Sequence, residues 1–122
     1  MTGQHAARRY RVTGSHTRSY ELPMCLTAGD AVTVERWDTT WPAWVWCSRR
    51  GEPSGWVPEA FLAVSPDGTA QVLRDYSSLE LTVTPGDIVM GLEIVGGWIR
   101  CRSEHGDEGW VPEENCSRRE DG

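Results

Sequence analysis

Short alternations of apolar and polar residues recur along the chain and predict β-strands. The alternating segments are Met24-Cys25-Leu26, Val32-Thr33-Val34, Val45-Trp46-Cys47 and Leu81-Thr82-Val83. A period of two is expected where one face of a strand is buried. Clusters of Gly, Pro, Asp and Ser bound these segments, and no helical period extends beyond one turn. The pattern therefore predicts an all-β protein.

The chain contains an internal repeat. Gly55-Trp56-Val57-Pro58-Glu59 recurs as Gly109-Trp110-Val111-Pro112-Glu113, and the same offset of 54 residues carries Trp44–Cys47 onto Trp98–Cys101. Upstream, the Gly-Asp turn at residues 29–30 recurs at 86–87, so the first copy has three additional residues around Asp38–Pro42. Length changes confined to a loop are typical of two copies of one fold.

Each copy has room for five short strands in about 55 residues, which is too little for a wide open sheet with both faces covered. We therefore expect two small, partly open five-stranded barrels in tandem. The expected domains are residues 9–64 and 70–117, with residues 1–8 and 118–122 as flexible tails. Ser65-Pro66-Asp67-Gly68 has turn chemistry and predicts a short linker at residues 65–69. So short a linker predicts a contact between the two barrels.

The order of motifs in the second copy resembles the Src-homology-3 (SH3) domain. The motifs are Val72-Leu73-Arg74-Asp75-Tyr76, Glu80-Leu81-Thr82-Val83, Pro85-Gly86-Asp87, Trp98-Ile99-Arg100-Cys101 and Gly109-Trp110-Val111-Pro112. They correspond to the SH3 signatures ALYDY, E-L-x-F, G-D, W-W-x-A and G-Y-I-P. The first copy matches from Met24 onward, with residues 12–16 in place of ALYDY. Both copies resemble SH3-like barrels of bacterial proteins.

The repeated Trp-Val-Pro cluster raises the question of which face its rings occupy. If Val57 and Val111 point inward, strand alternation places the neighbouring Trp and Pro side chains on the outer face. The same alternation places Trp44 and Trp46 outside when Val45 and Cys47 are inside. Because several adjacent indoles are costly to expose to water, we expect something to cover them.

The resemblance implies that this outer face is a groove for a proline-rich or extended peptide of a partner protein. The residues that it implies for peptide binding in the first copy are Trp44, Trp46, Trp56, Pro58, Phe61, His16, Tyr20 and Glu21. In the second copy they are Tyr76, Glu80, Trp98, Trp110 and Pro112. Glu21 and Glu80 stand for the acidic residues that pair with a ligand Arg or Lys in the SH3 family. The second copy has Arg74 at an aromatic position of the family and Asn115 at another, so the first groove is the stronger candidate.

Two further interpretations of the aromatic residues remain open. Trp98 and Trp110 also fit a structural cluster that stiffens a small barrel. The residue at the position of Trp46 in the second copy is Arg100, so a Trp there predicts a covering partner, either another protein or the second barrel. The alternatives to a peptide-binding module are thus an accessory subunit whose Trp faces pack between the domains, and a bacterial SH3 variant that binds a cell-wall glycan.

Composition argues against several other functions. A formal charge of −6 would repel a polyphosphate backbone, so no nucleic-acid partner is expected. No stretch approaches the roughly 20 apolar residues of a membrane helix, and the first ten residues contain no apolar run typical of a secretory signal. We therefore expect a cytoplasmic protein without a membrane partner; its oligomeric state stays open.

Neither the cysteines nor the histidines predict a metal site or an enzyme. Four cysteines without a C-x-x-C pair do not suggest a metal, and the matched positions of Cys47 and Cys101 predict buried core thiols, with Cys25 outside. His5, His16 and His105 are scattered, and no third group is in place to orient a base. We expect no catalysis, no cofactor and no metal.

Overall fold

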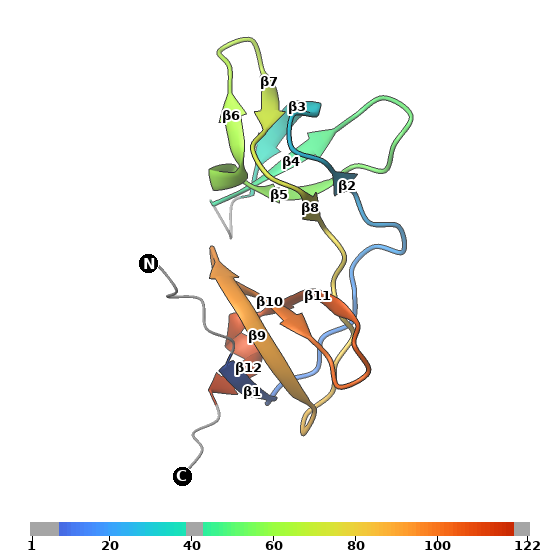
Figure 1. Cartoon of the computed structure of the whole chain (residues 1–122), viewed down its shortest axis with the longest axis vertical. Helices are drawn as coiled ribbons and strands as arrows, with labels where there is room; N and C mark the ends of the chain where they lie inside the picture. The colour runs from blue at the N-terminus through green and yellow to red at the C-terminus, as the bar shows by residue number, and fades with distance from the viewer. Residues whose placement is uncertain (1–7, 39–42, 119–122) are drawn as a thin grey trace. The chain divides into compact units, whose positions relative to one another are not determined.

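The computed structural model describes residues 8–38 and 43–118 and divides the chain into two compact units (Figure 1). Unit 1 combines Met1–Tyr20 with Leu79–Gly122, and unit 2 is Glu21–Ser78. Within the described residues, β-strands and two 3-10 turns account for all regular elements. Trp41, Pro42 and His5 lie outside the described residues.

Unit 2 is built on a five-stranded antiparallel sheet in the order β5-β4-β3-β7-β6. Its strands are β3 (Ala31–Trp37), β4 (Trp44–Ser48), β5 (Gly55–Pro58), β6 (Leu62–Val64) and β7 (Thr69–Val72). The 3-10 turn η1 (Glu59–Phe61) joins β5 to β6. A short ribbon of β2 (Cys25–Leu26) and β8 (Tyr76–Ser77) completes the unit.

Unit 1 repeats this design with the sheet order β11-β10-β9-β1-β12, again antiparallel. Its strands are β1 (Arg8–Val12), β9 (Ile88–Val95), β10 (Trp98–Arg102), β11 (Glu108–Pro112) and β12 (Cys116–Arg118). The turn η2 (Glu113–Asn115) lies between β11 and β12. The prediction of an all-β fold with two five-stranded SH3-like barrels is confirmed.

The two units exchange their first strands. β1 precedes the first repeat in the sequence but pairs with β9 and β12, so in Figure 1 a blue strand lies in an orange and red sheet. β7 opens the second repeat but pairs with β3 and β6 of the first. Val12 of β1 lies opposite Cys116, and Val72 of β7 lies opposite Leu62. Because Leu62 and Cys116 are equivalent residues of the two repeats, β1 and β7 occupy equivalent positions in the two sheets. The chain therefore passes between the units twice, after Tyr20 and after Ser78.

The compact units do not follow the bounds of the two repeats. Residues 9–64 and 70–117 do not delimit the compact units, and the segment expected as a linker is the hairpin turn between β6 and β7. Ser65 N–H donates to the Thr69 carbonyl at 2.8 Å, and the Asp67 carboxylate accepts from Thr69 N–H at 3.0 Å. Alternation could not reveal the exchange, because β1 and β7 both present two alternate apolar residues that fit either barrel.

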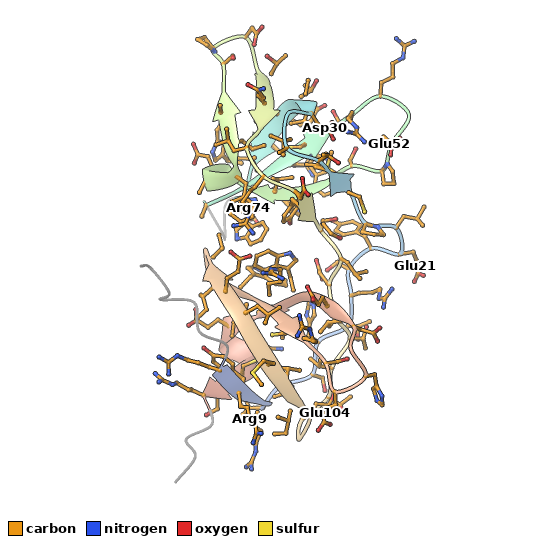
Figure 2. The ribbon with its side chains drawn as sticks, viewed as in Figure 1. Arg9, Glu21, Asp30, Glu52, Arg74 and Glu104 are labelled. Atoms are coloured by element: carbon orange, nitrogen blue, oxygen red, sulfur yellow. The ribbon has the colours of Figure 1, made fainter. Side chains whose placement is uncertain are left out.

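The buried residues of the described parts of both barrels are apolar. Val45, Cys47, Val57 and Val111 are fully buried, so the predicted inward direction of these side chains is confirmed. The core of unit 1 consists of Tyr10, Val12, Leu81, Val83, Val89, Ile99, Cys101 and Val111. The charged residues labelled in Figure 2 belong to turns and outer faces: Asp30 precedes β3 and pairs with Arg49 at 2.6 Å.

Candidate functional site

The outer face of β4 and β5 gathers aromatic side chains in unit 2. Trp44 lies opposite Pro58 and Trp46 opposite Trp56 in the antiparallel register. The Trp46 and Trp56 rings meet edge to face, with centroids 5.1 Å apart and an interplanar angle of 70°. Edge-to-face contacts at this distance are favourable for indoles, because the positive edge of one ring meets the negative face of the other.

Arg36 extends this cluster onto the neighbouring strand. It lies opposite Trp46 in the β3–β4 register, and its guanidinium carbon is 5.1 Å from the Trp46 centroid and 5.5 Å from that of Trp56. Both distances are within cation–π range. One edge of the aromatic face of unit 2 therefore carries a positive charge.

The chain after β5 adds the other end of the face. The Phe61 and Tyr76 rings meet edge to face at 5.7 Å, and the Tyr76 hydroxyl donates to the Trp56 carbonyl at 2.7 Å. Arg74, labelled in Figure 2, places its guanidinium carbon 4.1 Å from the Phe61 centroid. We call the set Trp44, Trp46, Trp56, Pro58, Phe61 and Tyr76 the unit 2 aromatic face.

Most of the rings that strand alternation places on the outer face are buried. Trp44, Phe61 and Tyr76 are only 5–8% exposed and Pro58 is fully buried, while Trp46 and Trp56 are half-buried. In unit 1, Trp110 and Pro112 are buried and Trp98 is half-buried. Strand alternation fixes which face a ring occupies but not what packs over that face.

Residues 79–81 pair with β11 at Trp110. Trp110 N–H donates to the Leu79 carbonyl at 2.9 Å, and Leu81 N–H donates to the Trp110 carbonyl at 3.1 Å. These residues therefore lie beside β11 as a further bridge partner, with Glu80 opposite Trp110.

Unit 1 has a different cluster, centred on Glu80. His16 Nε2 lies 2.9 Å from Glu80 Oε1, and the backbone N–H and hydroxyl of Ser19 both donate to that oxygen at 3.0 Å. The His16 ring meets Trp98 edge to face at 5.5 Å. The acidic side chain that the SH3 resemblance assigned to a ligand cation is thus bound by the chain itself.

Polar groups replace the aromatic residues at the other equivalent positions of unit 1. Asn115, at the place of Phe61, donates from Nδ2 to the carbonyls of Gly14 and Ser15 at 3.3 and 2.9 Å. Arg100, at the place of Trp46, bonds Glu93 at 2.7 Å and Glu108 at 3.0 Å.

Arg102 completes this ion-pair network on β10 and β11. It contacts Glu108 at 2.9 Å, and its hydrogen bond to that carboxylate lowers the pKa of Glu108. The outer face of unit 1 is therefore mainly ionic where that of unit 2 is aromatic.

The strand exchange regroups the predicted site residues. His16 and Tyr20, expected beside Trp44, lie in unit 1, whereas Tyr76, expected beside Trp98, lies in unit 2. Tyr20 and Glu21 are both exposed, at the point where unit 1 ends and unit 2 begins in the sequence; Glu21 is labelled in Figure 2. Arg36 is a site residue that was not predicted from the sequence. The signal that could have found it is its place on the strand paired with Trp46.

The cysteines and acidic residues add no further centre among the residues described. Cys47 and Cys101 are buried, Cys116 is half-buried and Cys25 is exposed, and all four are free thiols, as expected for the first two and for Cys25. No group of three metal-binding side chains occurs in residues 8–38 and 43–118. No helix in those residues is long and apolar enough to cross a membrane.

The fold and its two clusters define a tandem SH3-like protein. Sequence profiles of the variant SH3 domain match residues 9–65 and 69–118. The chain therefore belongs to the variant SH3 domain family. No curated protein matches the sequence. SH3-like domains commonly act as protein-interaction modules and are typically non-catalytic.

Proposed function

We propose that the protein is a non-catalytic interaction module whose unit 2 aromatic face binds an extended, proline-rich segment of a partner protein. The observation that carries the proposal is the row from Trp56 to Tyr76 and Phe61, joined by the Tyr76 hydroxyl bond. The equivalent positions of unit 1 hold the ion pairs of Arg100 and the hydrogen bonds of the Asn115 amide to the backbone, so the two units differ in chemistry.

A polyproline II segment suits such a row. It has three residues per turn and no internal hydrogen bonds, so its Pro rings can stack on aromatic side chains while its carbonyls accept from indole N–H groups. The half-buried Trp56 and Trp46 are the rings that solvent reaches in this face. Arg36 beside them favours a ligand with an acidic residue at that end, the opposite of the basic ligand that the resemblance implies.

Binding is tested by titrating the full chain with a labelled proline-rich peptide that carries one Glu, and with matched peptides in which Glu is Lys or each Pro is Ala. We expect saturable binding of the first peptide, weaker binding after Arg36→Gln, and loss after Trp56→Ala. Trp37→Ala is the matched control, since Trp37 is an exposed Trp of unit 2 outside the aromatic face. Equal binding by Trp56→Ala and the unmodified chain would contradict the proposal.

A structural role is the second candidate, and the burial of Trp44 and Trp110 favours it. In that case the rings act as packing, and the chain serves as an accessory subunit without a peptide ligand. Tryptophan emission distinguishes the two functions. A spectrum that shifts to shorter wavelength with the peptide supports the module, whereas a spectrum already at short wavelength and unchanged by every peptide supports the structural role.

A further inference from the structure

The first strands of the two barrels differ inside at one position. β1 points Tyr10 and Val12 inward, and β7 points Ala70 and Val72 inward at the equivalent places. Val12 and Val72 are the same residue type, so they do not distinguish one barrel interior from the other. Tyr10 and Ala70 differ by a whole aromatic ring.

The strands that pair with β1 and β7, which are β9 and β3, also differ at one inward position. β9 presents Val89 opposite Tyr10, and β3 presents Val32 opposite Ala70. Two residues further along, β9 has the buried Gly91 where β3 has Val34. The strand pairing confirms that Val34 and Gly91 are equivalent. Val34 N–H donates to the carbonyl of Gly68, which lies two residues before Ala70. Gly91 pairs with Arg8, which lies two residues before Tyr10.

The large and small residues are matched within each barrel. A Cβ added to Gly91 would lie 2.5 Å from Cε1 of Tyr10 and 3.1 Å from Cγ2 of Ile99, so the Tyr10 ring occupies the space that a side chain at position 91 would need. In unit 2 the equivalent positions carry the small, buried Ala70 and the half-buried Val34. Close-packed interiors require such matching of large against small side chains.

The alternative arrangement, in which each barrel is built from one repeat, mismatches both positions. Tyr10 would then meet Val34, and the two side chains would compete for one volume. Ala70 would meet Gly91 and leave a void where the ring now lies. We infer that the pairs Tyr10–Gly91 and Ala70–Val34 select the strand-exchanged topology over the arrangement of one repeat per barrel.

The choice of strand topology also decides which residues form the unit 2 aromatic face and which form the Glu80 cluster of unit 1, whatever these clusters bind. Each first strand leads directly into the segment that reaches the outer face of its barrel. β1 brings His16 to Trp98 and Glu80, and β7 brings Tyr76 to Phe61 and Trp56. With one repeat per barrel, His16 would join the aromatic face and Tyr76 the ionic one.

Disulfide trapping in the full chain reports the topology directly. In a Cys25→Ser background, Arg11→Cys with Ile88→Cys marks the exchanged arrangement, because these residues are Cα partners in the β1–β9 register. Arg11→Cys with Ala31→Cys marks the alternative, since Ala31 holds the equivalent place on β3, opposite Gln71. Cysteines at paired positions of neighbouring strands are near enough to bridge.

The deciding variants exchange the inward residues. The chain with the original core should form the 11–88 disulfide and not the 11–31 disulfide. Tyr10→Ala with Ala70→Tyr should abolish the 11–88 disulfide, either by forming the 11–31 disulfide instead or by losing the folded circular dichroism spectrum. Adding Val34→Gly and Gly91→Val restores both size matches in the exchanged form, and the four-fold variant should again form the 11–88 disulfide.

Two results would overturn the inference. One is a folded Tyr10→Ala, Ala70→Tyr variant that still forms the 11–88 disulfide as fully as the original core. The other is a four-fold variant that fails to regain the 11–88 disulfide, which would show that size matching at these positions does not govern the strand pairing.

Discussion

At the scale of single residues, Cys47 and Cys101 show how the barrel interior changes side-chain chemistry. Burial raises the pKa of the Cys47 thiol to about 11 and that of Cys101 to about 12, from an ordinary value of 9.0. Removal from water penalises the thiolate far more than the neutral thiol. Both thiols are therefore poor nucleophiles in the folded chain.

The shifted pKa values predict a loss of stability in alkali. In the unfolded chain these thiols ionise near pH 9, whereas in the folded chain they stay neutral to higher pH. Their contribution to the free energy of unfolding is therefore complete below pH 9 and is lost as the pH rises through about 11 and 12. We expect the denaturation midpoint to fall less between pH 8 and pH 10.5 in a Cys47→Ala, Cys101→Ala variant than in the original chain. Cys25→Ser, which removes an exposed thiol, should leave the original pH dependence unchanged. A matching fall in the double variant would show that other groups cause it.

Two equivalent glycines predict unequal costs of substitution. A Cβ at Gly109 would lie 2.9 Å from the Leu79 carbonyl oxygen, a backbone atom that is fixed by its bond to Trp110. At Gly55 the nearest atoms are the Met24 Cβ at 3.0 Å and the Ser78 hydroxyl oxygen at 3.1 Å. Gly109→Ala should destabilise the protein by about 1–3 kcal/mol in urea unfolding, and by more than Gly55→Ala, because its close neighbours include two paired backbone atoms, the Leu79 oxygen and the Leu81 nitrogen at 3.1 Å. Equal destabilisation by the two substitutions would mean that the backbone of residues 79–81 moves easily to accommodate the added Cβ.

The limits of sequence reasoning are also visible at this scale. The inward direction of Val45, Val57 and Val111 follows from alternation alone, and the structure confirms it. The burial of Trp44 and Trp110 could not follow from the same rule. A period of two separates the two faces of a strand, but it contains no information about what packs on the outer face.

At the scale of elements, the segment after β1 is held to the second repeat by hydrogen bonds. His16 exchanges two backbone bonds with Val83, at 3.0 and 2.8 Å, and Glu80 receives both donors of Ser19. The neighbouring Arg18 N–H donates to the Thr82 hydroxyl at 3.0 Å. The sequence assigns His16 and Tyr20 to the first copy, whereas residues 16–19 bond to residues 80–83 of the second.

These bonds predict a local effect of removing Glu80. In Glu80→Ala the Ser19 amide loses its charged acceptor, and we expect its hydrogen exchange to accelerate by about tenfold. Thr82→Val is the matched control, which should accelerate the Arg18 amide and leave that of Ser19 unchanged. Amide exchange followed by NMR distinguishes the two. An unchanged Ser19 amide in Glu80→Ala would show that the backbone bridge to Val83 holds the segment alone.

At the scale of the whole molecule, repetition predicted the number and type of barrels but not the assignment of strands. The offset of 54 residues and the turn signals gave two five-stranded units, as found. The assignment depends on side-chain volume at Tyr10, Ala70, Val34 and Gly91. Hydrophobic pattern treats these four positions as alike, so only a comparison of sizes across strands could have predicted it.

Strand exchange predicts that the two halves stay together after the chain is cut. A protease site inserted between Pro66 and Asp67 lies in the β6–β7 turn, and cleavage there leaves β1 in one fragment and its partners β9 and β12 in the other. We expect the fragments to co-elute in size-exclusion chromatography and to separate only in denaturant. Fragments that separate under native conditions would indicate one repeat per barrel.

The interlocked strands bear on how such a gene can change. Recombination between the two repeated stretches of coding sequence would delete one copy and leave β1 as the only first strand, facing whichever receiving strand survives. Where that strand is β3, the tyrosine meets a valine in place of a glycine, and the shortened product inherits a crowded interior. A product that keeps β9 retains the match of the tyrosine with glycine, so the position of the crossover decides whether the shortened chain can pack.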